Sequence, residues 1–343
     1  MTELGISLGL SPRESTSQFV RVLQTAEALG ISTAWVLDSQ LAMKDAYMAL
    51  AVAGRETSTI NVGPGVTNLV TRHESVVANA MATLENLCPG RVVVGIGTGD
   101  SAVFPIGERP MRLAECERGV LRLQRLLGGE AVEMGGREHR LSFVPPRRPP
   151  VFFAASQPGT LSLAGRVADG VIVMGPSDPD TVRSQLAVVD RAACDAGRDP
   201  ADLTRDLWVT MSVGDGVAPL RDVKSWCSAQ ARWMMTWRTL PERFAPYARE
   251  MERVAREYDF GTHLSLRAGH GELVSDDLAR LLAVAGTQEE CQTRLSQLAS
   301  TGVDRVTVSL LSGGRLRRLH EVVDVWRALE SAATVGPPGP GSG

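Results

Sequence analysis

The sequence has little of the chemistry that marks metal-binding, secreted or membrane proteins. Its five cysteines are scattered without a CxxC pair, so neither a zinc site nor a disulfide framework is indicated, and buried free thiols are expected. No apolar run reaches the ~18 residues of a membrane-spanning helix, and the chain begins with a strand pattern rather than a basic and apolar leader. These absences predict a cytoplasmic protein without a membrane anchor.

A charge excess of one sign is also missing. Only Lys44 and Lys224 are lysines, the formal net charge is −3, and arginines alternate with acidic residues along the whole length. A nucleic-acid-binding protein needs a basic stripe, and a peripheral membrane protein needs a polybasic segment. The composition therefore favours a small-molecule partner over nucleic acid or a membrane.

The sequence does contain a regular alternation of short apolar runs with amphipathic segments. The predicted strands are residues 4–10, 33–37, 60–68, 91–98, 151–155, 171–174, 207–213 and 303–310. The predicted helices are residues 17–29, 45–56, 73–87, 111–127, 160–168, 178–196, 288–300 and 315–332. Eight strands with helices between them favour an α/β fold, a (β/α)8 TIM barrel, as one domain over residues 1–332. An open doubly wound sheet is the alternative, but the first turn lacks the GxGxxG pattern of a dinucleotide site.

Two internal segments and the C-terminal tail leave this alternation. Residues 130–143 are typical of a surface hairpin that turns at Gly135-Gly136. Residues 217–282, after the seventh strand, have a helical pattern and are predicted to form an insertion that acts as a lid and shapes a substrate pocket. Residues 333–343 lack large apolar side chains, so we expect disorder there.

Polar side chains follow the third and fourth predicted strands, at the point where each strand ends. Thr67 and Asn68 end the third strand, and Thr98, Asp100 and Ser101 end or follow the fourth. Because the carboxyl ends of parallel strands meet on one side of the sheet, these side chains are expected to share one rim. That rim is the predicted place of the chemistry.

Four segments in a fixed order resemble a known family. They are residues 63–68 (GPGVTN), 71–73 (TRH), 95–102 (GIGTGDSA) and 164–171 (AGRVADGV). Together they are similar to the luciferase-like family of flavin and deazaflavin oxidoreductases, and most of all to its methylenetetrahydromethanopterin reductase branch. The resemblance implies hydride transfer between a bound 8-hydroxy-5-deazaflavin, coenzyme F420, and a small organic substrate. An FMN-dependent monooxygenase that uses reduced flavin and O2 is the alternative, and a non-catalytic ligand-binding or partner subunit is the second. The family also implies a homodimer.

The resemblance implies where a cofactor would bind. Family members have a non-prolyl cis peptide that backs the flavin ring, and the matching bond is Gly65-Val66; a plain β-bulge is the alternative. The turn after the fifth strand matches the family's phosphate-binding turn, since free amides at a helix N-terminus suit an anion, although an ordinary helix cap would look the same. The implied cofactor-binding residues are Ser39, Gly65, Val66, Thr67, Asn68, Gly97, Thr98, Gly99, Ser101, Ala155, Ser156, Gly159 and Thr160.

The candidates for proton handling are Asp38, Asp100 and His73. Asp38 ends the second strand and Asp100 follows the fourth, where relatives place an acidic residue near the ring; either could instead cap the segment that follows. Several relatives have a histidine just after the second strand, but this chain has Ser39 there. His73 follows the third strand and could contact phosphate or a substrate carboxylate, or cap its helix.

The substrate-binding candidates are Arg72 and four residues of the insertion. Trp233 and Trp237 have helical spacing and are expected to pack one face of the insertion. His263 and His270 flank Arg267, but their spacing is too wide for a histidine metal pair, so no metal is predicted. Both histidines are predicted to lie at the surface or to line the rim, where either could contact substrate.

Overall fold

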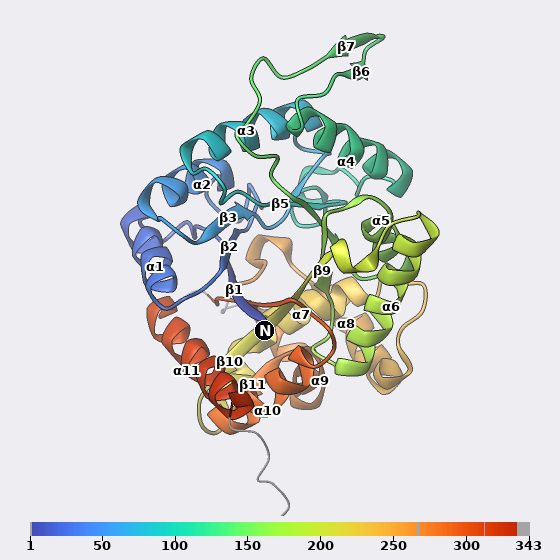
Figure 1. Ribbon diagram of the computed structural model, residues 1–343. Helices are drawn as coiled ribbons and strands as arrows, with labels where there is room; N and C mark the ends of the chain where they lie inside the picture. The colour runs from blue at the N-terminus through green and yellow to red at the C-terminus, as the bar shows by residue number, and fades with distance from the viewer. Residues whose placement is uncertain (1, 266–267, 312, 335–343) are drawn as a thin grey trace, which may run out of the picture.

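The computed structural model describes residues 2–265, 268–311 and 313–334. Its parallel strands follow the order β3-β2-β1-β12-β10-β9-β8-β5-β4, and helices surround them in a ring (Figure 1). β3 and β4 are consecutive pieces of the third predicted strand, so the sheet closes on itself through residues 61–68. Counting these two pieces as one strand, the ring has eight strands. The predicted (β/α)8 barrel is confirmed, and the open sheet is excluded because the first and last strands, β1 and β12, pair with each other.

The strand and helix bounds agree with the sequence pattern to within a few residues. The barrel strands are β1 (Glu3–Leu8), β2 (Thr33–Val36), β3 (Asn61–Pro64), β4 (Thr67–Asn68), β5 (Val94–Gly97), β8 (Val151–Ala155), β9 (Gly170–Met174), β10 (Thr204–Val213) and β12 (Arg305–Ser309). The outer helices are α1 (Thr16–Ala28), α2 (Ala46–Glu56), α3 (Glu74–Leu87), α4 (Leu113–Leu127), α5 (Pro158–Val167), α6 (Pro179–Asp195), α10 (Gln288–Ala299) and α11 (Arg315–Thr334). None of the described helices is long and apolar enough to cross a lipid bilayer.

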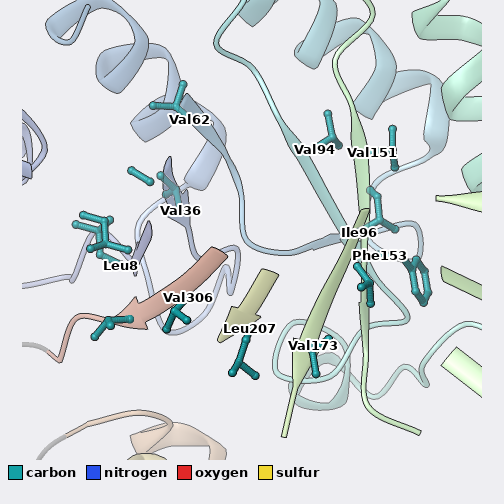
Figure 2. Packing of buried hydrophobic residues seen from close by; sticks show 14 of the residues in the cluster. Leu8, Val36, Val62, Val94, Ile96, Val151, Phe153, Val173, Leu207 and Val306 are labelled. Atoms are coloured by element: carbon teal, nitrogen blue, oxygen red, sulfur yellow. The ribbon is translucent and has the colours of Figure 1, made fainter. Parts of the chain in front are cut away.

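Alternation along each strand separates two apolar layers. Side chains such as Val36, Phe153 and Val173 point outward into the main hydrophobic cluster, which the outer helices cover (Figure 2). The residues between them point inward, and Trp35, Phe152, Ile172 and Trp208 are members of a separate cluster inside the barrel. Because side chains of a strand alternate between its two faces, both layers follow from one strand pattern. The inner cluster therefore forms the floor of any cavity at the carboxyl ends of the strands.

The insertion is helical, as its pattern predicted, and has a hydrophobic cluster of its own. It contains α7 (Ala218–Met234), α8 (Ala248–Glu257) and α9 (Asp276–Leu282), joined by 3-10 turns. Val223, Phe244 and Val254 are among the fully buried members of its cluster. A short strand, β11 (Val284–Gly286), follows and pairs with β10. The sequence did not predict β11, because three residues carry too little periodic signal.

The structure confirms the predicted hairpin but describes only the first residues of the predicted tail. β6 (Val132–Met134) and β7 (Arg137–His139) form the predicted antiparallel hairpin, which projects from the ring of helices (Figure 1). The predicted disordered tail lies outside the described residues from residue 335 on, and its first two residues are the end of α11. Four of the five thiols are buried as expected, whereas Cys194 is exposed.

Candidate active site

The barrel has a cavity of about 240 Å³ at the carboxyl ends of its strands. We call the part formed by strand ends and the loops after them the barrel wall. The part formed by Trp226, Ala229, Gln230, Trp233, His263 and Leu264 is called the insertion wall. The predicted site residues that line the cavity are Asp38, Ser39, Gly65, Val66, Thr67, Asn68, Gly97, Thr98, Gly99, Asp100, Ser101, Trp233 and His263.

The floor of the barrel wall requires glycine. The Gly65-Val66 peptide bond is cis, as the resemblance implied, and it lies between β3 and β4. A Cβ atom on Gly65 would lie 2.6 Å from Cβ of Trp35 and 2.7 Å from Cη2 of Trp208. A Cβ atom on Gly97 would lie 2.9 Å from Cγ2 of Val66. Larger residues at either position would therefore collide with the floor.

Asp38 is held in a hydrogen-bond network on the barrel wall. Its Oδ2 atom accepts a hydrogen bond from Thr67 Oγ1 at 2.7 Å and lies 3.5 Å from Arg72 Nε. Tyr47 in turn donates from its hydroxyl to Thr67 Oγ1 at 3.1 Å, and its ring lies under the Arg72 guanidinium. Burial raises the pKa of Tyr47 above its ordinary value, so this phenol stays protonated and remains a donor. The network holds Asp38 at one place on the rim.

Asp100 has a different kind of partner. Arg232 of α7 donates from Nη2 to Asp100 Oδ2 at 2.6 Å, so this ion pair joins the insertion to the loop after β5. The Asp100 side chain is 37% exposed, whereas that of Asp38 is only 4% exposed. The Arg232 guanidinium also lies over the rings of Tyr258 and Phe260, with its carbon 5.2 and 4.9 Å from their centroids.

His263 of the insertion wall also belongs to a cluster of aromatic side chains with Tyr258, Phe260 and His270. Its Nδ1 atom is 2.5 Å from the Tyr258 hydroxyl, and Tyr258 stacks on His270 with ring centroids 4.3 Å apart. Burial, and then the charges of Arg232 and His270, lower the pKa of His263 to about 4. Burial likewise lowers the pKa of His270. His263 is therefore a neutral imidazole at physiological pH.

Several buried polar atoms around the cavity have no partner among the described residues. They are Trp208 Nε1, Trp226 Nε1 and Gln230 Oε1. All three side chains line the cavity, and an unpartnered buried polar atom costs about 1–3 kcal/mol. These atoms have almost no exposed surface, so a ligand in the cavity would reach them only if the side chains that cover them moved.

The structure does not bring every predicted residue to the cavity. His73 is the N-cap of α3, where its ring accepts a hydrogen bond from the Ser75 amide, so the helix-cap alternative holds for this residue. Arg72 lies behind Asp38, and Trp237 packs edge-on against Trp233. His270 is buried against Tyr258. None of these four is among the residues that line the cavity.

The predicted phosphate-binding turn lies at the same end of the barrel but outside the cavity lining. Ala155 ends β8, and α5 begins at Pro158, two residues earlier than expected. The amides of Ser156 and Gln157 both donate to Thr160 Oγ1, each at 3.2 Å. A Cβ atom on Gly159 would lie 2.7 Å from Leu113 Cδ1. Both of these amides lie before the start of α5, so the two bonds hold the turn and do not involve the amides of the first helical turn, at Gly159 and Thr160.

Sequence reasoning missed several residues of the cavity. Ala154, Met174 and Trp208 occupy inward positions of their strands, so the period-two pattern carried their signal. Gln230 follows Trp226 by one helical turn on α7 and shares its face. Met43 lies in the loop after β2, where no pattern in the sequence marks it.

Fold and site together define an enzyme-like parallel barrel with its cavity at the carboxyl ends of the strands. The model of the luciferase-like monooxygenase family matches residues 2–305. The chain belongs to this family and is an oxidoreductase of it.

Individual relatives agree with this assignment. The chain is 26% identical to 5,10-methylenetetrahydromethanopterin reductase of Methanolobus tindarius, over 86% of this chain and 90% of that protein. It is 34% identical to F420-dependent hydroxymycolic acid dehydrogenase of Mycobacterium tuberculosis, over 65% of this chain and 66% of that protein. The fold matches that of an F420-dependent secondary alcohol dehydrogenase in complex with an F420–acetone adduct, with a TM-score of 0.78. That match has 19% identity and covers 96% of this chain and 99% of the other.

Proposed function

We propose that this protein transfers a hydride between coenzyme F420 and a small organic substrate. The observation that carries the proposal is the cavity at the strand ends, lined by the cis Gly65-Val66 bond and by the carboxylates of Asp38 and Asp100. Relatives named as F420-dependent enzymes support the choice of cofactor. The volume of about 240 Å³ is below the ~300–1,000 Å³ of complete ligand pockets, so it suits a ring system whose tail extends outside.

The residues around the cavity fit such a ring. Gly65, Gly97 and Ala154 keep the floor of the barrel wall free of bulky side chains, so a flat ring can approach the backbone there. The deazaflavin would supply the hydride chemistry at its ring carbon C5. The turn at Ser156, Gly159 and Thr160 stays our proposal for the phosphate, with the amides of Gly159 and Thr160 in the first turn of α5 as the donors.

The chain's own residues then exclude water and handle the proton. Trp226 and Trp233 cover the cavity from the insertion side, where the insertion acts as the lid. Asp38 and Asp100 are the carboxylates that line the cavity, so we assign proton handling to them and leave His73 out. The hydrogen bond between Ser39 and Ser101, 2.7 Å between their hydroxyl oxygens, ties together the loops that carry both carboxylates.

An FMN-dependent monooxygenase is the second candidate function, and the family's description favours it. Both cofactors have a tricyclic ring, so the same cavity serves either one. A barrel that only binds a ligand is disfavoured, because the relatives are named as reductases and dehydrogenases.

Cofactor titration separates these candidates. Purified protein would be titrated with F420 and with FMN, each oxidised and reduced, while cofactor fluorescence or absorbance is followed. We expect micromolar or tighter binding of F420 and much weaker binding of FMN. Tight FMN binding without F420 binding would favour the monooxygenase, and no binding of either would contradict the enzyme function. A homodimer and a cytoplasmic location remain predictions; light scattering of the purified protein tests the former.

A further inference from the structure

The side chain of Gln185, in α6, joins the turn of residues 156–160 to the edge of the cavity. It donates from Nε2 to Ser156 O at 2.9 Å and, at the longer distance of 3.5 Å, to Met174 O. Ser156 belongs to the turn before α5, whereas Met174 ends β9 and lines the cavity. Because β8 and β9 are neighbouring parallel strands, this one amide spans the carboxyl ends of both.

The position of Gln185 follows from the packing of α5 on α6, which lie side by side outside the barrel (Figure 1). A Cβ atom on Gly165 of α5 would lie 2.3 Å from Val189 O of α6, so the two helices are in close contact there. Gln185 lies one helical turn before Val189 and therefore on the same face of α6. The outer helices of the barrel run in the same direction, so this side chain reaches the start of α5.

Local packing fixes the orientation of the Gln185 amide. The residue is 5% exposed, and a Cβ atom on Gly175 would lie 3.2 Å from its Nε2 atom, so glycine after β9 leaves room for the amide. Both groups that face Nε2 are carbonyl oxygens, which require a donor. Oε1 is buried and has no hydrogen-bond partner among the described residues. A methionine would fill similar space without this unpartnered oxygen, so what the amide adds is the hydrogen bond to Ser156 O.

Bonds within the turn fix its shape but not its place. Thr160 Oγ1 accepts from the amides of Ser156 and Gln157 and donates to Gln157 O at 3.0 Å. All of these partners lie within residues 156–160, so they would move together with the turn. The bond from Gln185 comes from another helix and ties the turn to the end of β9.

We propose that Gln185 is a positioning residue for the phosphate of the cofactor: it fixes the place of the turn relative to the cavity, so that ring and phosphate of one molecule bind together. The inference rests on the proposed function, and in particular on this turn as the phosphate site. Gln185 acts through Ser156 O. A site held in place before binding loses less free energy when it orders around the ligand, so the benefit should appear in the phosphate contacts alone.

Four ligands separate phosphate binding from ring binding. F420 and 8-hydroxy-5-deazariboflavin share the deazaflavin ring, but the second lacks the phosphate and the tail beyond it. FMN and riboflavin differ by the phosphate alone. Fluorescence titration gives the phosphate preference, which is the dissociation constant without phosphate divided by that with phosphate. We expect wild type to prefer F420 over 8-hydroxy-5-deazariboflavin by at least ~10-fold.

Gln185→Met removes the donor and keeps the length of the side chain. The phosphate preference should fall by ~3- to 10-fold, while the affinity for the phosphate-free ligand stays within about twofold of wild type. The matched control is Gln124→Met. Gln124 of α4 donates from Nε2 to Val167 O at 2.8 Å, which is the same kind of bond at the opposite end of α5. This variant should lower the melting temperature about as much as Gln185→Met does, and leave the phosphate preference unchanged.

The outcomes distinguish this inference from the proposed function. An unchanged preference in Gln185→Met, an equal loss in Gln124→Met, or an equal loss of affinity for the phosphate-free ligand would overturn the inference. A wild-type protein that binds the ring without any phosphate preference would also overturn it, but would leave the proposed hydride transfer intact. A preference for FMN over riboflavin that depends on Gln185, in a protein that does not bind F420, would support the inference and contradict only the proposed cofactor. Binding of none of the four ligands would contradict both.

Discussion

The two walls of the cavity are held in place by different kinds of contact. On the barrel wall, Gly97 is paired with Asn68 of the neighbouring parallel strand, the Gly65 amide donates to Val36 O at the end of β2, and the Asp38 network is buried. The insertion wall is tied to the barrel by side chains. Its tethers include the Arg232–Asp100, Arg243–Asp178 and Arg318–Asp222 ion pairs, the Gln230 Nε2 to Gly175 O bond, and the Ser177 Oγ to Leu282 O bond.

Their apolar cores differ in the same way. The barrel wall rests on the inner cluster around Trp35 and Trp208, whereas the insertion has a separate cluster that includes Phe244 and Val254. A unit with its own core and few tethers can open locally at a lower free energy than the barrel can unfold. We infer that the barrel wall sets the shape of the cavity and that the insertion wall controls access to it.

The largest effect is expected from filling the floor of the barrel wall. In Gly97→Val, Cβ lies 2.9 Å from Val66 Cγ2 and the added methyl groups occupy the cavity. F420 affinity should fall by about 100-fold, since overpacking costs up to ~3 kcal/mol. Fluorescence titration measures this F420 affinity. Gly269→Ala in the insertion, where a Cβ meets open space, is the matched control and should bind like wild type. Equal affinities of the two variants would contradict the placement of the ring at this floor.

Acid should lower the free energy of unfolding through His263, which lies in the insertion wall. The folded-state pKa of His263 is about 4, below the ordinary value of 6.5, so between these pH values the unfolded state binds more protons. The contribution to stability is complete above pH 6.5 and is lost as the pH falls toward 4. From pH 7 to pH 4, wild type should lose on the order of 2 kcal/mol more unfolding free energy than His263→Gln.

Denaturant titrations at several pH values measure this difference. His270, whose pKa is also lowered, is present in both proteins, as are the carboxylates and Arg232 around the aromatic cluster. The comparison therefore reports His263 together with its interactions with Arg232 and His270, while the separate contributions of the other groups cancel. Parallel pH dependences of the two proteins would show that His263 is not buried as a neutral ring.

Removing a tether should loosen one wall and spare the other. Arg232→Met breaks the ion pair with Asp100 and removes the guanidinium from the Tyr258 and Phe260 rings. Backbone amides of α7 and α8 should exchange with deuterium about tenfold faster, equivalent to ~1.4 kcal/mol, while β-strand amides keep their rates. Arg280→Met breaks an exposed pair with Asp277 and should change exchange by less than about twofold. Equal acceleration in strands and insertion would refute the idea of two separately held walls.

The smallest effect is expected within the Asp38 network. Tyr47→Phe removes the hydroxyl that donates to Thr67 Oγ1, but Thr67 still donates to Asp38. Unfolding free energy should fall by about 1 kcal/mol, and F420 affinity should change by less than ~3-fold. Thermal unfolding and fluorescence titration provide the two values. A loss of cofactor affinity comparable to that of Gly97→Val would mean that the network, rather than strand pairing, shapes the barrel wall.

The sequence predicted the barrel wall better than the insertion wall. Thr67, Asn68, Thr98 and Asp100 end or directly follow neighbouring strands, so strand order alone brings them to one rim. The partner of Asp100 could not be foreseen, because Arg232 lies 132 residues further along the chain. For His73 the sequence left proton handling and helix capping open, since the position that follows a strand can also cap the next helix, and the structure shows it as the N-cap of α3.

The sequence pattern alone predicted the barrel and its polar rim. Alternation along a strand and the alternation of strands with helices can both be recognised from residues that are close together in the chain. Contacts between distant segments decided the rest: that Arg232 pairs with Asp100, that Gln230 donates to Gly175 O, and that Arg243 pairs with Asp178. Such contacts depend on how independently formed layers pack against each other, and no periodicity in the chain encodes that packing.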